Sequence, residues 1–286
     1  MLANKTILII SLFILSISTK SQVYEIENVR LDEFRGSCEI PGFGYAIFYK
    51  GYKSIFSTKI RDSTIVELLD ENFVCIGKTK INKTISGYTT TGYFNDSTVL
   101  IACYNTNGMS NTLISFDHSG RFLKSLIYHN KYIGKIIPCK NKGYYILNAG
   151  KRKEQIFFLS NNLTKKWKLD GDRGLPINSF NTIHNFRHGF YDQSSGLIHS
   201  SETALVWCSV KNNRFGTGGE INCISSEGKK LFKYHLKNEN EKLIANIIDS
   251  NFVYLFVGIY NKSEFQFFSD YIYVRKLNLA GELIHE

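Results

Sequence analysis

The stretch from residue 170 to residue 202 gathers ionisable side chains and interrupts the rhythm of the surrounding sequence. His184 and His188 are four residues apart, the spacing at which a helix can place two imidazoles on one metal ion. The glutamate of the zinc-hydrolase motif is absent, and Asn185 stands in its place. In a β-strand this spacing puts both rings on one side but does not secure a shared ion. We assign no metal ligand and no catalytic residue, and predict that His184, His188 and Asp192 contact a ligand if this insertion forms a binding loop.

A second candidate is electrostatic, because positive charge is concentrated in one part of the chain. Residues 121–168 hold 12 lysines and arginines and a single acid, Glu154. Such a one-sided field attracts polyanions such as acidic polysaccharide, nucleic acid or an anionic membrane surface. The alternative is a solvated basic face that only aids solubility. The predicted ligand-binding residues of this cluster are Lys151, Arg152, Lys153, Lys165, Lys166 and Trp167.

Other motifs that carry chemistry are incomplete. Residues 170–174 begin like a calcium loop, but the third acid and the closing glutamate are missing. The glycine-rich stretch 216–219 lacks the Lys-Ser/Thr pair and the helix that a phosphate loop requires. The sequence contains no Gly-x-Ser-x-Gly motif, and no carboxylate pair stands out as a general acid and base. We therefore expect no cofactor.

The elements that must position these residues are strands. Aromatic residues make up 14% of the chain and there are only 3 prolines, a composition that favours pleated, half-buried strands. A short apolar strand recurs five times, at residues 45–48, 99–102, 144–147, 204–207 and 253–256. Each copy is followed by a polar loop, an alternating strand and a turn that leads into another strand.

Each unit contains a tight turn before its last strand. Such a turn needs a positive φ, which glycine tolerates best and asparagine next. The predicted turn residues are Asn72, Gly120, Asn162, Gly228 and Gly281, which are 48, 42, 66 and 53 positions apart. Periods of this size, with about four strands each, are typical of propeller blades. The predicted fold class is all-β, a β-propeller of about five to six four-stranded blades, because the long interval could contain a sixth unit or an enlarged loop.

Two of the units resemble a known repeat family. Residues 275–284 have the sequence Arg-Lys-Leu-Asn-Leu-Ala-Gly-Glu-Leu-Ile, residues 115–120 have Ser-Phe-Asp-His-Ser-Gly, and Trp167 lies in a last strand. This pattern resembles that of secreted bacterial β-propeller proteins, common in the Bacteroidetes, in which a strand ends in Lys-Leu-Asp-x-x-Gly. The resemblance covers most of residues 40–286. It implies a propeller fold and an exported or surface location, and it implies no reaction.

The first residues predict export. Lys5 precedes an apolar run over residues 7–17, and small residues follow at Ser18, Thr19 and Ser21. The run is short for a membrane span, so residues 1–21 are predicted to be a cleaved signal peptide. Residues 22–286 are then a single propeller domain without an integral membrane segment. We expect the mature protein to be secreted, periplasmic or attached to the cell surface.

The six cysteines permit disulfides in an exported chain. Their spacing is irregular, there is no Cys-x-x-Cys, and Cys75, Cys103, Cys139 and Cys208 lie inside apolar runs. A buried cysteine behaves as a small hydrophobic residue, so we predict free thiols in the strand cores.

Two functional hypotheses follow from the sequence. The favoured hypothesis is a non-enzymatic propeller that binds a polysaccharide or a protein partner through its loops or its basic blade; nucleic acid is not the expected partner. The alternative is a propeller hydrolase or lyase that acts on carbohydrate, with its site in residues 170–202. Propeller enzymes need acids, metals or nucleophiles that converge at one end of the channel, and this sequence offers a dispersed set.

Overall fold

The chain is built from strands, as its composition predicts. The computed structural model describes residues 34–51, 63–81, 88–105, 110–129, 133–149, 154–170, 198–209, 220–238, 240–259 and 272–286, which form twenty strands. No helix among these residues is long and apolar enough to cross a membrane. The predicted signal peptide, residues 1–21, lies outside the described residues.

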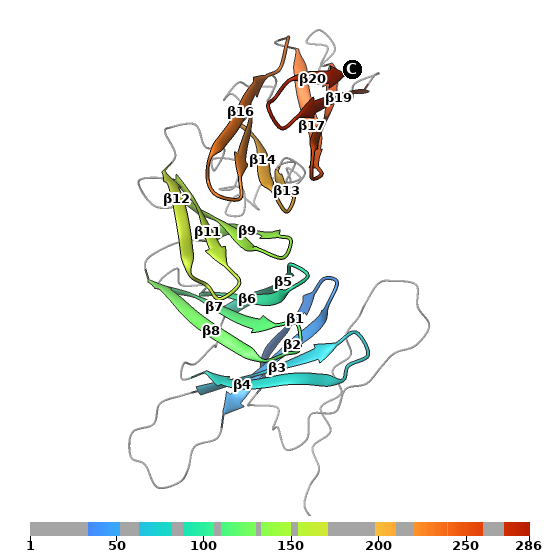
Figure 1. Cartoon of the computed structure of the whole chain (residues 1–286). Helices are drawn as coiled ribbons and strands as arrows, with labels where there is room; N and C mark the ends of the chain where they lie inside the picture. The colour runs from blue at the N-terminus through green and yellow to red at the C-terminus, as the bar shows by residue number, and fades with distance from the viewer. Residues whose placement is uncertain are drawn as a thin grey trace, which may run out of the picture. The chain divides into compact units, whose positions relative to one another are not determined.

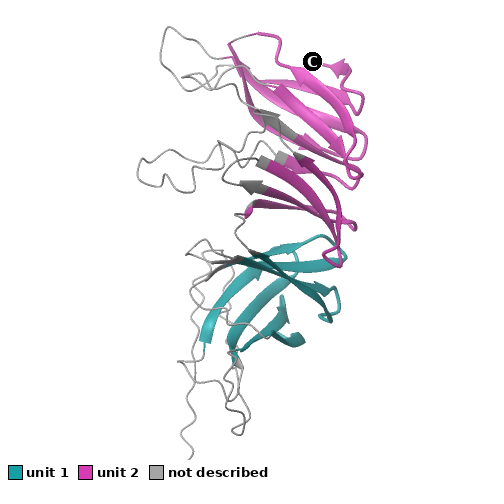
Figure 2. Ribbon diagram, turned by 90° about the vertical axis from the view of Figure 1, so that its left-hand side faces the viewer, with its two compact units in different colours: residues 1–130 teal, residues 131–286 magenta. Residues whose placement is uncertain are grey.

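The chain divides into two compact units, residues 1–130 and 131–286, which Figure 2 colours separately. Four-stranded antiparallel sheets make up both units (Figure 1). The first unit holds sheet 1, with β1 (Phe34–Ile40), β2 (Gly44–Gly51), β3 (Ser63–Asp70) and β4 (Cys75–Ile81), and sheet 2, with β5 (Tyr88–Phe94), β6 (Thr98–Asn105), β7 (Ser110–Asp117) and β8 (Phe122–His129). The single domain expected over residues 22–286 stays a prediction.

The second unit holds three sheets. Sheet 3 contains β9 (Ile133–Cys139), β10 (Gly143–Ala149), β11 (Glu154–Ser160) and β12 (Lys165–Asp170). Sheet 4 contains β13 (Ile198–Ser200), β14 (Ala204–Ser209), β15 (Glu220–Ser225) and β16 (Lys230–His235). Sheet 5 contains β17 (Glu241–Ile248), β18 (Phe252–Ile259), β19 (Ile272–Asn278) and β20 (Leu283–His285).

Every sheet is a meander in which neighbouring strands follow one another in the chain. The five apolar strands recognised in the sequence all lie in second strands, namely β2, β6, β10, β14 and β18. The prediction of four-stranded units is therefore confirmed for the five described sheets. A sixth unit stays untested, because residues 171–197 lie outside the described residues.

The turn between the third and fourth strands has one geometry in all five sheets, and the sequence-based assignment was wrong by one residue in two of them. The residue with positive φ is Phe73, Gly120, Leu163, Gly228 or Gly281, and not Asn72 or Asn162. In each turn this residue donates its N–H to the carbonyl three residues earlier. We call these five residues the left-handed turn residues. They are separated by 47, 43, 65 and 53 positions.

The asparagines do not take this position because the turn is fixed by another side chain. Three residues before the left-handed residue, an oxygen-bearing side chain accepts backbone N–H groups from inside the turn. The oxygen of Asp117 accepts from Ser119 and Arg121, at 3.0 and 2.9 Å, and that of Asn278 accepts from Ala280 and Glu282, at 3.0 and 2.9 Å. Asp70, Ser160 and Ser225 occupy the same position and also accept turn N–H groups. This capped turn holds Phe73 and Leu163 left-handed despite their side chains.

A β-bulge follows every one of these turns. The pairing register between the third and fourth strands shifts once in each sheet, which leaves one unpaired residue in the fourth strand. These residues are Ile76, Leu123, Lys166, Leu231 and Ile284. A type I turn followed by a left-handed residue and a bulge is a common three-residue hairpin connection. The bulge decides which side chains of the fourth strand share a face.

The sheets bury their apolar faces against one another within each unit. In the first unit, Phe48 and Val66 of sheet 1 pack in one cluster with Ile101 and Phe116 of sheet 2. In the second unit, one cluster joins sheets 3 and 4, and another joins sheets 4 and 5. Both faces of an inner sheet must therefore be apolar, which explains the nearly continuous hydrophobic second strands.

In sheets 2, 4 and 5, the turn packs against the fourth strand of the preceding sheet in the same unit. A Cβ added at Gly228 would lie 2.7 Å from the ring of Trp167 on β12, and one added at Gly281 would lie 2.7 Å from the Cβ of Phe232 on β16. A Cβ added at Gly120 would overlap the carbonyl of Ile76 and would lie 2.9 Å from the nitrogen of Gly77, both on β4. Glycine is required at these three turns by close approach as well as by its positive φ.

The five cysteines whose side chains are described are free, as predicted. Cys103, Cys139 and Cys223 are buried, in agreement with thiols in the strand cores. Cys75 is exposed, which corrects its expected burial, because it begins the edge strand β4. The side chain of Cys208 lies outside the described part of the structure.

The close packing of the sheet 4 turn against β12 can be tested at Gly228. We expect Gly228→Ala to lower the free energy of unfolding by about 1–2 kcal/mol, because alanine is strained in the left-handed backbone conformation. The overlap of the new Cβ with the ring of Trp167 should lower it by roughly 1–3 kcal/mol more. Gly42→Ala is the matched control, because Gly42 has a φ of 75° but only Phe94 within 4 Å, at 3.9 Å. Urea unfolding of both variants measures the difference. Equal losses would show that the turn of sheet 4 is not tightly seated on β12.

Candidate binding surface

The structure describes three of the predicted ligand-binding residues, and all three lie on β12. They are Lys165, Lys166 and Trp167, in the last strand of sheet 3. The other predicted site residues fall outside the described residues: Lys151, Arg152 and Lys153, and also His184, His188 and Asp192. Their role stays a prediction. The described candidate surface therefore consists of β12 and its neighbours in the second unit.

The lysines of β12 are exposed because β12 is an edge strand. Lys165, Lys166 and Lys168 all face solvent, whereas Trp167 and Leu169 between and beside them are half-buried against the core of sheets 3 and 4. Lys166 is the bulge residue, so Lys165 and Lys168 fall on one face of the sheet although they are three residues apart. The ammonium group of Lys165 lies 5.6 Å from the centre of the Phe157 ring.

Trp167 serves packing within the protein. Its ring stacks on Phe158 with centroids 5.9 Å apart and 9° between the planes, and it lies 6.0 Å from the ring of Tyr145. Its indole Nε1 donates to the carbonyl of Ser226 in the neighbouring sheet, at 2.7 Å. Tyr144 and Tyr145, the other aromatic residues flanking the basic cluster, are completely buried. Trp167, Tyr144 and Tyr145 therefore pack against other side chains of the protein.

A second basic strand, β16, was not predicted from the sequence, because its lysines lie outside residues 121–168, where the positive charge is concentrated. Lys229, Lys230 and Lys233 are exposed along its edge. Lys233 forms an ion pair with Glu220 of β15, with Nζ and Oε2 2.6 Å apart. Partial burial works to raise the pKa of Glu220, but hydrogen bonds from Lys233 and Asn222 outweigh it and lower that pKa. The recurrence of lysine at fixed distances from the turn residue would have revealed this strand.

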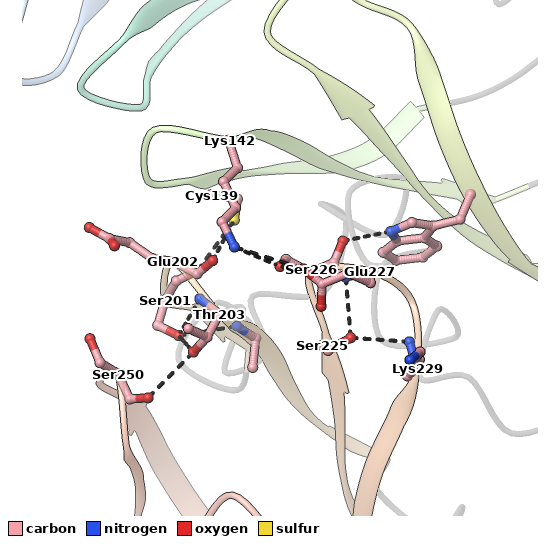
Figure 3. Close-up of polar contacts among 12 residues, drawn as sticks. Cys139, Lys142, Ser201, Glu202, Thr203, Ser225, Ser226, Glu227, Lys229 and Ser250 are labelled. Atoms are coloured by element: carbon pink, nitrogen blue, oxygen red, sulfur yellow. Dashed lines mark hydrogen bonds and ion pairs between the residues drawn. The ribbon is translucent and has the colours of Figure 1, made fainter.

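The turns at one end of the second unit form a polar network (Figure 3). Lys142, in the turn between β9 and β10, reaches the hydroxyl of Ser226 at 3.0 Å and the carboxylate of Glu227 at 3.8 Å. The backbone N–H of Ser226 donates to the carbonyl of Thr203 at 2.7 Å, and the Thr203 hydroxyl donates to the carbonyl of Ser250 at 3.4 Å. The network therefore ties the turns of sheets 3, 4 and 5 together.

The acid and the thiol in this network show no sign of activation for catalysis. Hydrogen bonds from Ser226 and Ser225 hold the pKa of the Glu227 carboxyl below its ordinary value. Cys139 is buried, its Sγ lies 3.3 Å from the carbonyl of Ser201, and burial raises the pKa of the thiol to about 11. A reactive cysteine needs a lowered pKa and solvent access, so this thiol is a packing residue.

A buried ion cluster lies in sheet 5. Both terminal nitrogens of Arg275 bind the two oxygens of Glu241, at 2.8 and 2.7 Å, and Nη2 also binds Glu286 at 2.8 Å. Only 3% of the surface of Arg275 and of Glu241 is exposed. The hydrogen bonds from Arg275 lower the pKa of Glu241, and those from Glu241 raise the pKa of Arg275. The cluster is fully paired, and it joins β17, β19 and the end of the chain.

The described residues contain no group of three or more histidine, cysteine or acidic side chains that could hold a metal ion. In the second unit, β12 and β16 each carry exposed lysines. This arrangement can hold an anion by charge, and it offers no nucleophile paired with a base.

The sequence matches no protein-family model, and no curated protein is similar to it in sequence. Its structure is similar to a eukaryotic initiation factor, with a TM-score of 0.47 and 9% identity over 90% of this chain and 55% of that one. It is similar to a prolyl endopeptidase, with a TM-score of 0.47 and 9% identity over 87% and 34% of the two chains. It is also similar to a neuraminidase-like protein of A/flat-faced bat/Peru, with a TM-score of 0.35 and 10% identity over 81% of this chain and 84% of that one.

The ion cluster of sheet 5 predicts a pH-dependent stability. The folded protein lowers the pKa of Glu241 below its ordinary value of 4.5. The ion pair with Arg275 therefore stabilises the fold fully above pH 4.5, and this stabilisation is lost as the pH falls through the pKa of Glu241 in the folded protein. Glu241→Gln should lower the free energy of unfolding by about 3 kcal/mol at pH 7, with a smaller difference from the unmodified protein at pH 3. Urea unfolding at both pH values measures this, with Glu282→Gln, an exposed carboxyl of sheet 5, as the control. A difference that does not shrink at pH 3 would contradict the assignment.

Proposed function

We propose that the protein is an exported, non-enzymatic β-propeller that binds an anionic polysaccharide through the lysines of β12. The observation that carries this proposal is the exposure of Lys165, Lys166 and Lys168 along one edge strand. Export is supported by the apolar run over residues 7–17 and the small residues that follow it.

The propeller is supported by a repeat position that is buried in four sheets and exposed in the fifth. The residue seven positions before the left-handed turn residue is at most 1% exposed in sheets 1 to 4, where it is Val66, Leu113, Ile156 or Ile221. In sheet 5 the residue is Val274, which is 45% exposed, and Ile247 and Ile272 of the same sheet are 49% and 58% exposed. An apolar sheet face of this kind needs a cover, and in a propeller the faces of a blade are covered by neighbouring blades.

Binding is tested with the variant Lys165→Gln/Lys166→Gln/Lys168→Gln. We expect the unmodified protein to bind dextran sulfate and polygalacturonate at low salt and to release them at high salt, because exposed charges are screened. The triple variant should bind roughly tenfold or more weakly. Neutral dextran should bind neither protein. Titration calorimetry at two salt concentrations measures both effects.

The control variant is Lys50→Gln/Lys80→Gln, which removes positive charge from exposed positions on β2 and β4 of sheet 1. It should bind the two polyanions nearly as well as the unmodified protein. Binding that falls equally in both variants would point to net charge alone. Binding that is absent, or indifferent to salt, would contradict the proposed function.

A further inference from the structure

One face of sheet 5 contains a buried asparagine whose amide group has no partner. Asn246 lies on β17 and is 0% exposed. Neither its amide oxygen Oδ1 nor its amide nitrogen Nδ2 has a hydrogen-bond partner among the described residues. Leaving a buried amide unpaired is costly, so folded proteins pair such groups with other protein atoms or with ordered water. The amide of Asn246 therefore needs a partner from outside the described chain.

Asn246 faces the neighbouring sheet. It pairs with Leu255 of β18, and directly opposite residues of two antiparallel strands share one face of the sheet. Leu255 belongs to the apolar cluster that joins sheets 4 and 5, as do Leu243 and Ile248 of β17 itself. The amide thus lies inside the packed interface between two sheets of the second unit, away from the surface.

The repeat does not require an asparagine at this position. The equivalent residue is the first-strand residue that pairs, through the second strand, with the third-strand residue six positions before the left-handed turn residue. It is Ser37, Gly92, Ile136 or Ile198 in sheets 1 to 4. Ile136 of sheet 3 is only 3% exposed. Because an aliphatic side chain can fill this position, the packing of the unit does not account for the amide.

The ion cluster of sheet 5 does not account for it either. Arg275 pairs with Leu255 from the other side, which places it two strands, or about 10 Å, from Asn246. The guanidinium of Arg275 is bound to Glu241 and Glu286. The arginine therefore serves its two carboxylates, and the asparagine lies across Leu255 from it.

The backbone of β17 offers further hydrogen-bonding groups beside the amide. Among the described strands β17 is the first of its sheet and pairs only with β18, so backbone N–H and C=O groups along its other edge point away from the ladder. Its register also shifts between Leu243 and Ala245, which leaves Ile244 out of the ladder two residues before Asn246. A buried water makes about three hydrogen bonds. The two amide atoms and one backbone group of this edge would supply them.

We propose that Asn246 forms a binding site for one internal water molecule in the interface between sheets 4 and 5. The ligand must accept a hydrogen bond from Nδ2 and donate one to Oδ1, and water does both. A close-packed interior has few voids larger than a water molecule, so the same interface selects against larger polar ligands. The site is independent of the proposed function. Its water exchanges with solvent only when the two sheets separate locally, so its residence time reports that opening.

Magnetic relaxation dispersion of the water signal counts long-lived internal waters and tests the site. We expect Asn246→Ile, which introduces the residue type that sheet 3 has at this position, to remove about one of them. Asn246→Ser retains a donor and an acceptor and should keep the water. The matched control is Ile248→Leu, an apolar exchange on the same strand and face, which should also keep it.

A second measurement uses the unmodified protein and needs no variant to fold. In protein with isotopically labelled asparagine, the side-chain amide protons of Asn246 should show a nuclear Overhauser effect to a water that tumbles with the protein. The absence of this effect overturns the proposal. A water count that Asn246→Ile leaves unchanged overturns it as well. If Ile248→Leu loses a water just as Asn246→Ile does, the count follows packing in general, and the assignment to the amide is wrong.

Discussion

The structure depends on the requirement that each four-stranded sheet bury both of its apolar faces, which no single sheet can do for itself. Successive sheets satisfy it within each unit by packing face to face, as the shared clusters of sheets 1 and 2, 3 and 4, and 4 and 5 show. The close packing of a turn against the fourth strand of the preceding sheet fixes how the faces of the two sheets meet. Gly228 and Gly281 take part because a side chain there would overlap Trp167 or Phe232.

The same turn also organises the surface. Its capping oxygen, left-handed residue and bulge recur in five sheets, so each position of the fourth strand has the same direction in every copy. Lysines stand at two such positions in both β12 and β16 because the backbone repeats, and not because they are adjacent in the sequence. An edge strand that must avoid pairing with other chains favours lysine in any case, so a binding surface could arise from residues that already protected the edge.

The polar groups of the interior are directed toward stability. Arg275 is paired with two carboxylates, the turn network joins three sheets through Lys142 and Ser226, and the buried thiol of Cys139 has a raised pKa. Such arrangements satisfy buried polar groups that would otherwise destabilise the fold. Among the described residues, the exposed lysines of β12 are the groups proposed to contact an external partner.

The sequence by itself determined the strands, the four-stranded unit and the positive charge of β12, because alternation, aromatic content and charge are local properties of the chain. It located the turns only to within one residue at Phe73 and Leu163, since the capping side chains at Asp70 and Ser160 outweigh the preference for asparagine. Only the tertiary structure decided that Trp167 packs inside the protein and that Lys230 and Lys233 repeat the positions of Lys165 and Lys168. These relations depend on bulges and on contacts between sheets, which join residues about 60 positions apart in the chain.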